Sequence, residues 1–292
     1  MELNRWLLVV SLVLVIVTSL PTWASKNISS LQQEFAKLEK SSGGRLGIAA
    51  INIKNNQRIL YRANEIFPMG CTSKVMGVAA ILKKSMQDND FLQKRIRYTK
   101  EDLTNWTPIT EKHLADGMTI AELSEAAIIY SDNTAMNLLT KQLGGPQGLN
   151  AFARSIQDTH FKLDHWWPDE ALSSPESKQD ASTPMAMQES LRKLVLENVL
   201  GKSQREMLIQ WLKNNVSKNR IGAGVPKDWV VGNKTGTGFN YGTTNDIAVI
   251  WPPKANPIVI VVFYSSHKKD APKREDIIAS ATRLVINAYK KI

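Results

Sequence analysis

Three short motifs in this sequence combine a nucleophile, amines and hydroxyl groups in an arrangement suited to acyl transfer. Residues 71–74 (Cys-Thr-Ser-Lys) precede an apolar run with helical spacing, residues 131–133 (Ser-Asp-Asn) open a second helical segment, and residues 234–236 (Lys-Thr-Gly) lie on a predicted strand. A nucleophile at the start of a helix lies where the helix dipole favours developing negative charge. A lysine three residues further on shares that helical face and can accept or stabilise a proton. Together the motifs predict one catalytic site.

The three motifs resemble the S-x-x-K, S-D-N and K-T-G set of class A β-lactamases and penicillin-binding proteins. Flanking residues make the resemblance specific to class A β-lactamases: 67–69 before the first motif, Tyr130 before the second, and 232–246 around the third. The resemblance extends over nearly the whole chain after its first two dozen residues. It implies hydrolysis of β-lactam antibiotics through an acyl-enzyme. The sequence calls for no cofactor, and its histidines show no metal-binding spacing, so we predict no metal.

The resemblance also implies a role for each motif position. The reaction would use Cys71 as nucleophile, Lys74 to handle its proton, and Ser131 to relay a proton to the leaving nitrogen. Backbone N–H groups of residues 71 and 237 would form the oxyanion hole. The expected substrate contacts are Asn133, Lys234, Thr235, Thr237, Arg220 and, at the rim of the cleft, Trp106.

The sequence departs from the family at the positions that carry the chemistry. The nucleophile, a serine in the family, is Cys71, and Ser73 cannot replace it because it lies roughly 200° around the helix. At the position of the family's glutamate that activates the deacylating water, this chain has Trp167, which has one N–H donor and no basic group. At the position of the family's asparagine that helps to hold this water, this chain has Ala171. Glu170 takes a position that is apolar in the family, where an unpaired buried carboxylate is costly and could displace the segment.

These replacements lie in and beside a segment that resembles the family's Ω-loop. Asn137 matches the residue that ties this loop down, and His165 stands where many members have an arginine paired with the aspartate matching Asp180. The resemblance therefore implies a weaker clamp at His165.

The replacements predict severely impaired catalysis. Losing the nucleophile of a serine hydrolase costs on the order of 10⁶ in turnover. Cys71 is either a thiol made reactive by the helix start and Lys74, or a small buried side chain without chemistry. Two other functions remain open: a β-lactam-binding module that forms a lasting adduct, and a penicillin-binding peptidase.

Periodicity predicts the elements that position these residues. Strands are predicted over residues 45–53, 58–61, 229–237, 246–251 and 258–264. Helices are predicted over residues 29–39, 75–86, 119–130, 133–143, 185–197, 203–213 and 273–290. Residues 164–183 form a loop with little periodicity. The predicted fold is α/β, with an antiparallel sheet formed by both termini and flanking helices (25–66 and 214–292) and an inserted all-helical lobe (67–213).

The first 24 residues have the pattern of an export signal. Arg5 precedes an apolar run over residues 6–17, and Thr22-Trp23-Ala24 provides a cleavage pattern before Ser25. We therefore expect a periplasmic or secreted domain of residues 25–292, with no membrane anchor after cleavage.

Composition limits the partners. The chain has 37 Lys and Arg against 27 Asp and Glu, a net charge of +10, but these basic residues are scattered. Nucleic-acid binders usually cluster them, so we predict no nucleic-acid partner. A single cysteine excludes an intramolecular disulfide. We expect a monomer that binds small-molecule β-lactams.

Overall fold

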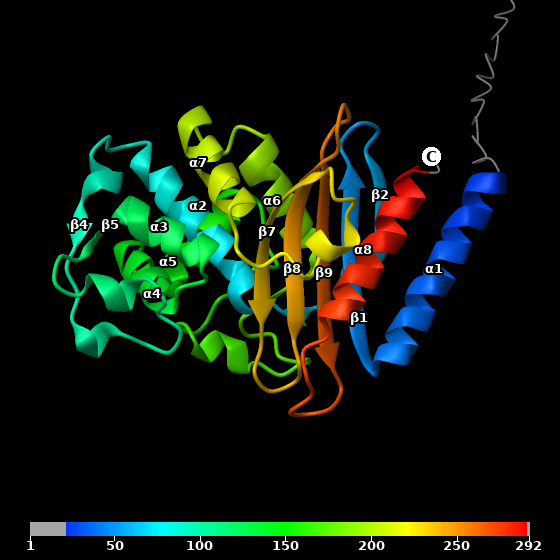
Figure 1. Ribbon diagram of the computed structural model, residues 1–292, viewed down its shortest axis with the longest axis horizontal. Coiled ribbons are helices and arrows are strands. Elements are labelled where there is room, and N and C mark those ends of the chain that lie inside the picture. The colour runs from blue at the N-terminus through cyan, green and yellow to red at the C-terminus, as the bar shows by residue number, and fades with distance from the viewer. Residues whose placement is uncertain (1–21, 291–292) are drawn as a thin grey trace, which may run out of the picture.

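A five-stranded antiparallel sheet in the order β2-β1-β9-β8-β7 organises one end of the molecule (Figure 1). This computed structural model describes residues 22–290, and for 22–29 only the backbone. The strands are β1 Gly44–Asn52, β2 Gln57–Tyr61, β7 Val230–Thr237, β8 Thr244–Trp251 and β9 Ile258–Ser266. All five predicted strands are present, and they come from both ends of the chain. The predicted fold class is confirmed.

The central strand β9 is buried on both faces because its side chains alternate between two cores. Val259, Val261 and Phe263 pack in a core shared with the helical lobe. The other core lies under the two terminal helices and takes the alternate residues Ile258, Ile260, Val262 and Tyr264. Burying each such side chain contributes about 1.5–3 kcal/mol. The continuous apolar run of β9 therefore fixes the sheet between two layers of helices.

Two terminal helices cover one face of the sheet, α1 Thr22–Ser42 and α8 Glu275–Lys290 (Figure 1). The sequence predicts a shorter first helix, 29–39, because the apolar spacing that marks its buried face is confined to those residues. The predicted export signal over residues 1–24 falls almost entirely on residues 1–21, which lie outside the described part of the chain.

The remaining helices form the helical lobe, and two of them, α6 and α7, also pack against the sheet. They are α2 Lys74–Ser85, α3 Ile120–Ile129, α4 Asn133–Gln142, α5 Pro146–Ser155, α6 Pro184–Leu196 and α7 Lys202–Lys213. The lobe also contains two two-stranded ribbons, which pair β3 Phe67–Pro68 with β6 Ala181–Ser182 and β4 Arg95–Ile96 with β5 Met118–Thr119. Helix α2 lies at the centre and is buried along nearly its whole length. No helix was predicted over the residues of α5; this helix begins at Pro146, directly after two glycines in the left-handed region.

Within residues 22–290, six 3₁₀ turns connect these elements: η1 Gly70–Ser73, η2 Phe91–Gln93, η3 Lys100–Asp102, η4 Thr110–His113, η5 Asp169–Leu172 and η6 Gly222–Gly224. Turn η1 matters most for the site, because it joins the sheet lobe to α2. Two glycines allow its backbone to approach β7 closely. A Cβ on Gly236 would lie 2.5 Å from the Met69 carbonyl oxygen, and Gly70, with φ +51°, lies against the backbone of Thr237. The edge strand β7 is therefore in direct contact with the turn η1 at the start of α2.

Candidate active site

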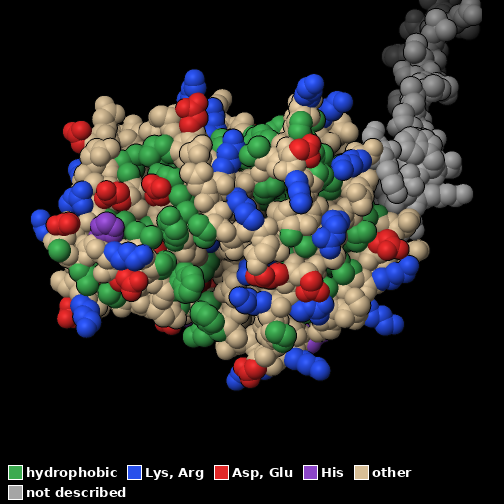
Figure 2. Space-filling view, in the orientation of Figure 1, with side chains coloured by type: hydrophobic (Ala, Val, Ile, Leu, Met, Phe, Trp, Pro, Cys, Tyr) green, Lys and Arg blue, Asp and Glu red, His purple; other side chains and the backbone are tan. Residues whose placement is uncertain are grey.

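A cleft of about 490 Å³ lies where the helical lobe meets β7. Figure 2 shows hydrophobic side chains gathered along the border between the two lobes on the face that it displays. Four exposed hydrophobic residues line the cleft: Trp106, Tyr130, Val216 and Phe239. Its polar lining includes a residue from each of the three motifs: Cys71, Ser131 and Lys234. The motifs, far apart in sequence, therefore meet in one cavity.

Cys71 lies half-buried in turn η1, three residues before α2 begins at Lys74. A Cβ on Gly70 would be 3.1 Å from the backbone nitrogen of Thr237, so the backbones of η1 and β7 run side by side at this point. This contact brings together the two segments that carry the backbone N–H groups of residues 71 and 237. Ser73 is fully buried, and its hydroxyl donates to the Gly70 carbonyl oxygen at 2.8 Å, so it does not face the cleft as a nucleophile.

The Ser131 hydroxyl lies between two buried lysines. Lys234 Nζ donates to Ser131 Oγ at 3.0 Å, and Lys74 Nζ lies 3.4 Å from the same atom and 2.7 Å from the Ser131 carbonyl oxygen. Ser131 is held at φ +59°, a conformation that costs a non-glycine residue energy and is typical of functional sites. The hydroxyl is therefore placed to exchange protons with either amine.

The two lysines change the acidity of the site. Burial raises the pKa of the Cys71 thiol, but the positive charges of Lys74 and Lys234, together with hydrogen bonds to Ser131 and Glu170, hold it below its ordinary value. Burial lowers the pKa of Lys234 to about 7, although negative charge at Cys71 opposes this. A lowered thiol pKa favours the nucleophilic thiolate.

The predicted substrate-binding residues occupy different depths of the cleft. Thr235 and Thr237 are partly exposed on β7, whereas Arg220 is only 3% exposed and lies behind Thr237. The Arg220 guanidinium donates to Thr237 Oγ1 at 2.8 Å and to the carbonyl oxygens of Gly236 and Asn245 at 2.7 and 2.8 Å. Arg220 is therefore a positioning residue that orients the Thr237 hydroxyl and adds positive charge beneath it.

The helical lobe provides the opposite wall. The Asn133 amide donates to the side chain and carbonyl oxygens of Asn105, each at 3.0 Å, and its Oδ1 accepts from Lys74 at 2.6 Å. Asp132 is the N-cap of α4 and accepts the Ala135 N–H at 2.8 Å. Trp106 is 67% exposed at the rim, and its indole donates to the Tyr130 carbonyl oxygen at 3.0 Å.

Residues 164–180 form a loop below Cys71, fixed at several points. Asn137 donates to the Trp167 carbonyl oxygen at 2.7 Å and accepts the Trp167 N–H at 3.1 Å. At the ends of the loop, His165 Nδ1 lies 2.6 Å from Asp180 Oδ2, and Asp180 Oδ1 accepts the N–H groups of Asp164 and His165. The hydrogen bond to Asp180 raises the pKa of His165. The histidine thus forms the contact to Asp180 for which the resemblance implies an arginine.

Trp167 fills the space at which the resemblance implies a catalytic glutamate. Its side chain is only 1% exposed, and its ring centroid lies 5.9 Å from Lys74 Nζ. The indole Nε1 is buried without a hydrogen-bond partner among residues 22–290. Ala171 is also buried, and its carbonyl oxygen accepts the Phe239 N–H at 3.1 Å, which joins the loop to the end of β7. Neither Trp167 nor Ala171 supplies a basic group.

Glu170 is the functional candidate whose contact with Cys71 the sequence did not predict. Its carboxylate is buried, as expected, at 1% exposure; Cys71 Sγ donates to Oε1 at 3.6 Å, and Oε2 has no hydrogen-bond partner among residues 22–290. Hydrogen bonds from Glu170 N to the Trp166 oxygen and from Ala171 N to the Pro168 oxygen define a tight turn. Trp167 precedes the turn η5, so residue spacing along the chain gave no signal for the direction of Glu170.

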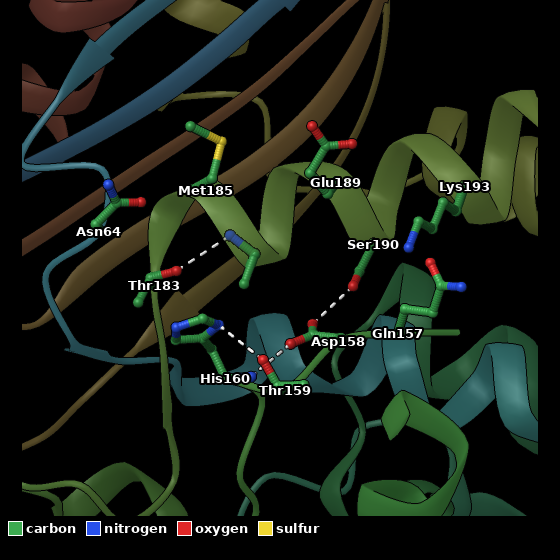
Figure 3. A pocket seen from close by; sticks show the side chains of 11 residues that line it. Asn64, Gln157, Asp158, Thr159, His160, Thr183, Met185, Glu189, Ser190 and Lys193 are labelled. Carbon is green, nitrogen blue, oxygen red and sulfur yellow. Dashed lines mark hydrogen bonds between the residues drawn. The ribbon is translucent and has the colours of Figure 1, made fainter. Parts of the chain in front are cut away.

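A second cavity, of about 260 Å³, lies beside α6 and is lined by none of the predicted site residues (Figure 3). Its buried carboxylate, Asp158, already accepts the Ser190 hydroxyl at 2.7 Å and the N–H groups of His160 and Phe161. Within residues 22–290 no cluster of three potential metal ligands occurs. Nor does that part of the chain contain a helix long and apolar enough to cross a membrane. The cleft at Cys71 is the candidate active site.

Comparison with known proteins identifies the class to which this fold and site belong. A family profile described as the β-lactamase enzyme family matches residues 30–289. β-Lactamase OXY-2 of Klebsiella oxytoca is 51% identical over 264 residues, 90% of each chain. β-Lactamase Toho-1 of Escherichia coli is 49% identical over 262 residues, 89% of this chain and 90% of that one.

Solved structures agree with the sequence relatives. A β-lactamase from Desulfarculus baarsii superposes with a TM-score of 0.88 at 42% identity, over 89% of this chain and 97% of that one. A variant of the last common ancestor of class A β-lactamases of Gram-negative bacteria gives a TM-score of 0.87 at 48% identity, over 90% and 99% of the chains. The chain belongs to the class A β-lactamases, a family of hydrolases.

Proposed function

We propose that this protein reacts with β-lactams by acyl transfer to Cys71 and that it releases the product slowly. The observation that carries the proposal is the position of Cys71 beside Lys74, Lys234 and the backbone of Thr237, on the wall of an open cleft. The relatives named above are β-lactamases. Their names support a β-lactam as the substrate, and the partly exposed Thr235 and Thr237 hydroxyls are suited to bind a substrate carboxylate.

Two features support slow turnover. A thiol takes the place of the serine hydroxyl that the resemblance implies, whereas the implied proton relay and oxyanion hole serve an oxygen nucleophile. The position from which the resemblance implies a water-activating glutamate is a buried tryptophan. Release of the acyl group therefore lacks its usual base, and we expect turnover below the roughly 1 s⁻¹ at which ordinary enzyme rates begin.

The proposal extends to the place of action. We infer an exported protein, periplasmic or secreted, with residues 1–24 removed, and a monomer. N-terminal sequencing of the protein recovered from the periplasm tests the cleavage site, and a size-exclusion mass near that of one chain tests the monomer. Recovery with residues 1–24 intact in the membrane fraction would contradict the export proposal.

Parallel assays with a chromogenic cephalosporin and with a cell-wall peptide that ends in two D-alanines test the activity. We expect slow opening of the cephalosporin by the protein, none by Cys71→Ala, and no cleavage of the peptide. Peptide cleavage that requires Cys71 would favour a penicillin-binding peptidase. One equivalent of cephalosporin opened, with no further turnover, would favour a β-lactam-binding module that keeps its adduct.

A further inference from the structure

We propose that Glu170 is the general base of this site: it shares one proton with Cys71 and takes a proton from the water that releases the acyl group. The proposal rests on acyl transfer to Cys71 and adds to it a catalytic residue at a position where the resemblance implies only an apolar side chain. It predicts that turnover is slow but not zero.

The geometry points to Glu170 because its carboxylate meets the reacting atom. Glu170 Oε1 lies 3.6 Å from Cys71 Sγ, and among residues 22–290 it is the carboxylate within hydrogen-bond distance of this sulfur. The second oxygen, Oε2, is buried with no hydrogen-bond partner in the same part of the chain. A buried polar atom costs free energy when no group hydrogen-bonds to it. One carboxylate oxygen of Glu170 thus contacts the nucleophile, and the other is free to accept a hydrogen bond.

The loop holds Glu170 in this position from both sides. On its N-terminal side, Trp167 is fixed to Asn137 by two hydrogen bonds. On its C-terminal side, the Ala171 carbonyl oxygen accepts the Phe239 N–H. With both neighbours fixed and the side chain buried, the Glu170 carboxylate has little freedom to turn towards solvent.

Electrostatics at the pair support proton sharing. Burial raises the pKa of Glu170 well above its ordinary value, and negative charge at Cys71 raises it further, while Lys74 opposes both. Lys74 and Lys234 stabilise the Cys71 thiolate. The other charged group that acts on Glu170 is Asp180, at the end of the loop, which also raises its pKa. These opposite directions favour one proton shared by the pair, held by the carboxyl group beside a thiolate.

Acylation then proceeds without an external base. The Cys71 thiolate attacks the lactam carbonyl carbon, an S–C bond forms, and the C–N bond of the ring breaks. Ser131 Oγ gives its proton to the ring nitrogen and regains one from Lys74, whose Nζ is 3.4 Å away. The proton on Glu170 then passes to Lys74. The products are a thioester on Cys71, a protonated ring nitrogen, an ammonium at Lys74 and a free Glu170 carboxylate.

Release returns the site to its starting state. The Glu170 carboxylate takes a proton from a water molecule, and the resulting hydroxide attacks the thioester carbonyl carbon. The C–S bond breaks, its electron pair stays on sulfur, and the acid product leaves. This step regenerates the thiolate beside a protonated Glu170. A general base must lie within hydrogen-bond reach of the proton that it takes, and Glu170 Oε1 lies 3.6 Å from the sulfur that carries the acyl group.

The first test needs no substrate and uses Cys71 as the single cysteine of the chain. The rate of alkylation by iodoacetamide, measured against pH, reports only on this thiol. We expect two titration steps in the parent protein, because two interacting groups lose protons in turn. Glu170→Gln should leave one step, and the control Asp169→Asn, an exposed carboxylate in the same turn, should leave both. A single identical step in all three proteins would overturn proton sharing.

The second test measures the lifetime of the penicillin adduct by intact mass in the same three proteins. Glu170→Gln should acylate but release its adduct about a hundredfold more slowly, at the lower end of what general bases contribute. The parent release rate should rise with pH as Glu170 ionises, whereas that of Glu170→Gln should not. Glu170→Asp, which keeps a carboxylate, should recover part of the rate and so separate loss of the base from a packing defect.

The outcomes separate this proposal from the function on which it rests. An adduct that forms in both proteins and decays at rates within about twofold would refute Glu170 as the base and leave acyl transfer to Cys71 intact. No adduct in either protein would refute acyl transfer and, with it, the release step, whereas the alkylation profile would still decide whether the pair shares a proton.

Discussion

Replacing Asn137 by alanine removes both hydrogen bonds that hold Trp167, and with them the anchor on one side of Glu170. The bonds are 2.7 and 3.1 Å long, and a typical bond contributes about 0.5–1.5 kcal/mol net. We therefore expect the free energy of unfolding to fall by about 2 kcal/mol. For a domain of this size that lowers Tm by about 4–8 °C.

The same variant should uncouple Glu170 from the reaction. In the Asn137→Ala background, Glu170→Gln should change the adduct lifetime by less than about tenfold, against about a hundredfold in the parent. The assay is a double-mutant cycle of adduct lifetimes by intact mass, with Tm measured on each protein. Asn214→Ala serves as the control, because it removes an exposed asparagine that only accepts from Gln210. If Asn137→Ala lowers Tm but leaves the full effect of Glu170→Gln, the loop anchor does not position the base.

Three further predictions concern the charged groups around the cleft. The pKa of His165 is raised in the folded protein, so its pairing with Asp180 stabilises the fold fully below the ordinary histidine pKa. This stabilisation is lost as pH rises through the raised pKa. Over that pH range Tm should fall in the parent protein but not in His165→Ala. Arg220→Lys should slow acylation by carboxylate-bearing β-lactams through a higher KM, because an ammonium cannot make the forked contacts to Thr237 and the two carbonyls. Lys234, with a pKa of about 7, should make the acylation rate fall above neutral pH, and Lys234→Ala should abolish that decline; an unchanged decline would exclude Lys234 as its source.

Much of the fold follows from local pattern. β9 was predictable because alternate side chains serve two cores, which demands an unbroken apolar run. The start of α1 and the separate helix α5 were not predictable from apolar spacing. Short helices among several others take their limits from tertiary packing and from turns such as that before Pro146.

The candidate site was likewise predictable from the sequence only in part. Motif spacing placed Cys71, Ser131 and Lys234 in one cleft, because each stands at the end of a helix or on an edge strand facing it. The depth of Arg220 was not visible in the sequence, since it depends on backbone carbonyls of β7 and β8. The direction of Glu170 was equally hidden. It depends on a tight turn and on a tryptophan that occupies the neighbouring space, neither of which periodicity reports.

The measurement that tests the account most directly is intact-mass analysis of the protein after incubation with a penicillin, followed by peptide mapping. We predict a mass increase equal to one penicillin, located on Cys71, which decays slowly and returns free enzyme. No mass increase, an adduct located on Ser73 or Ser131, or one that clears within seconds would contradict acyl transfer to Cys71 with slow release.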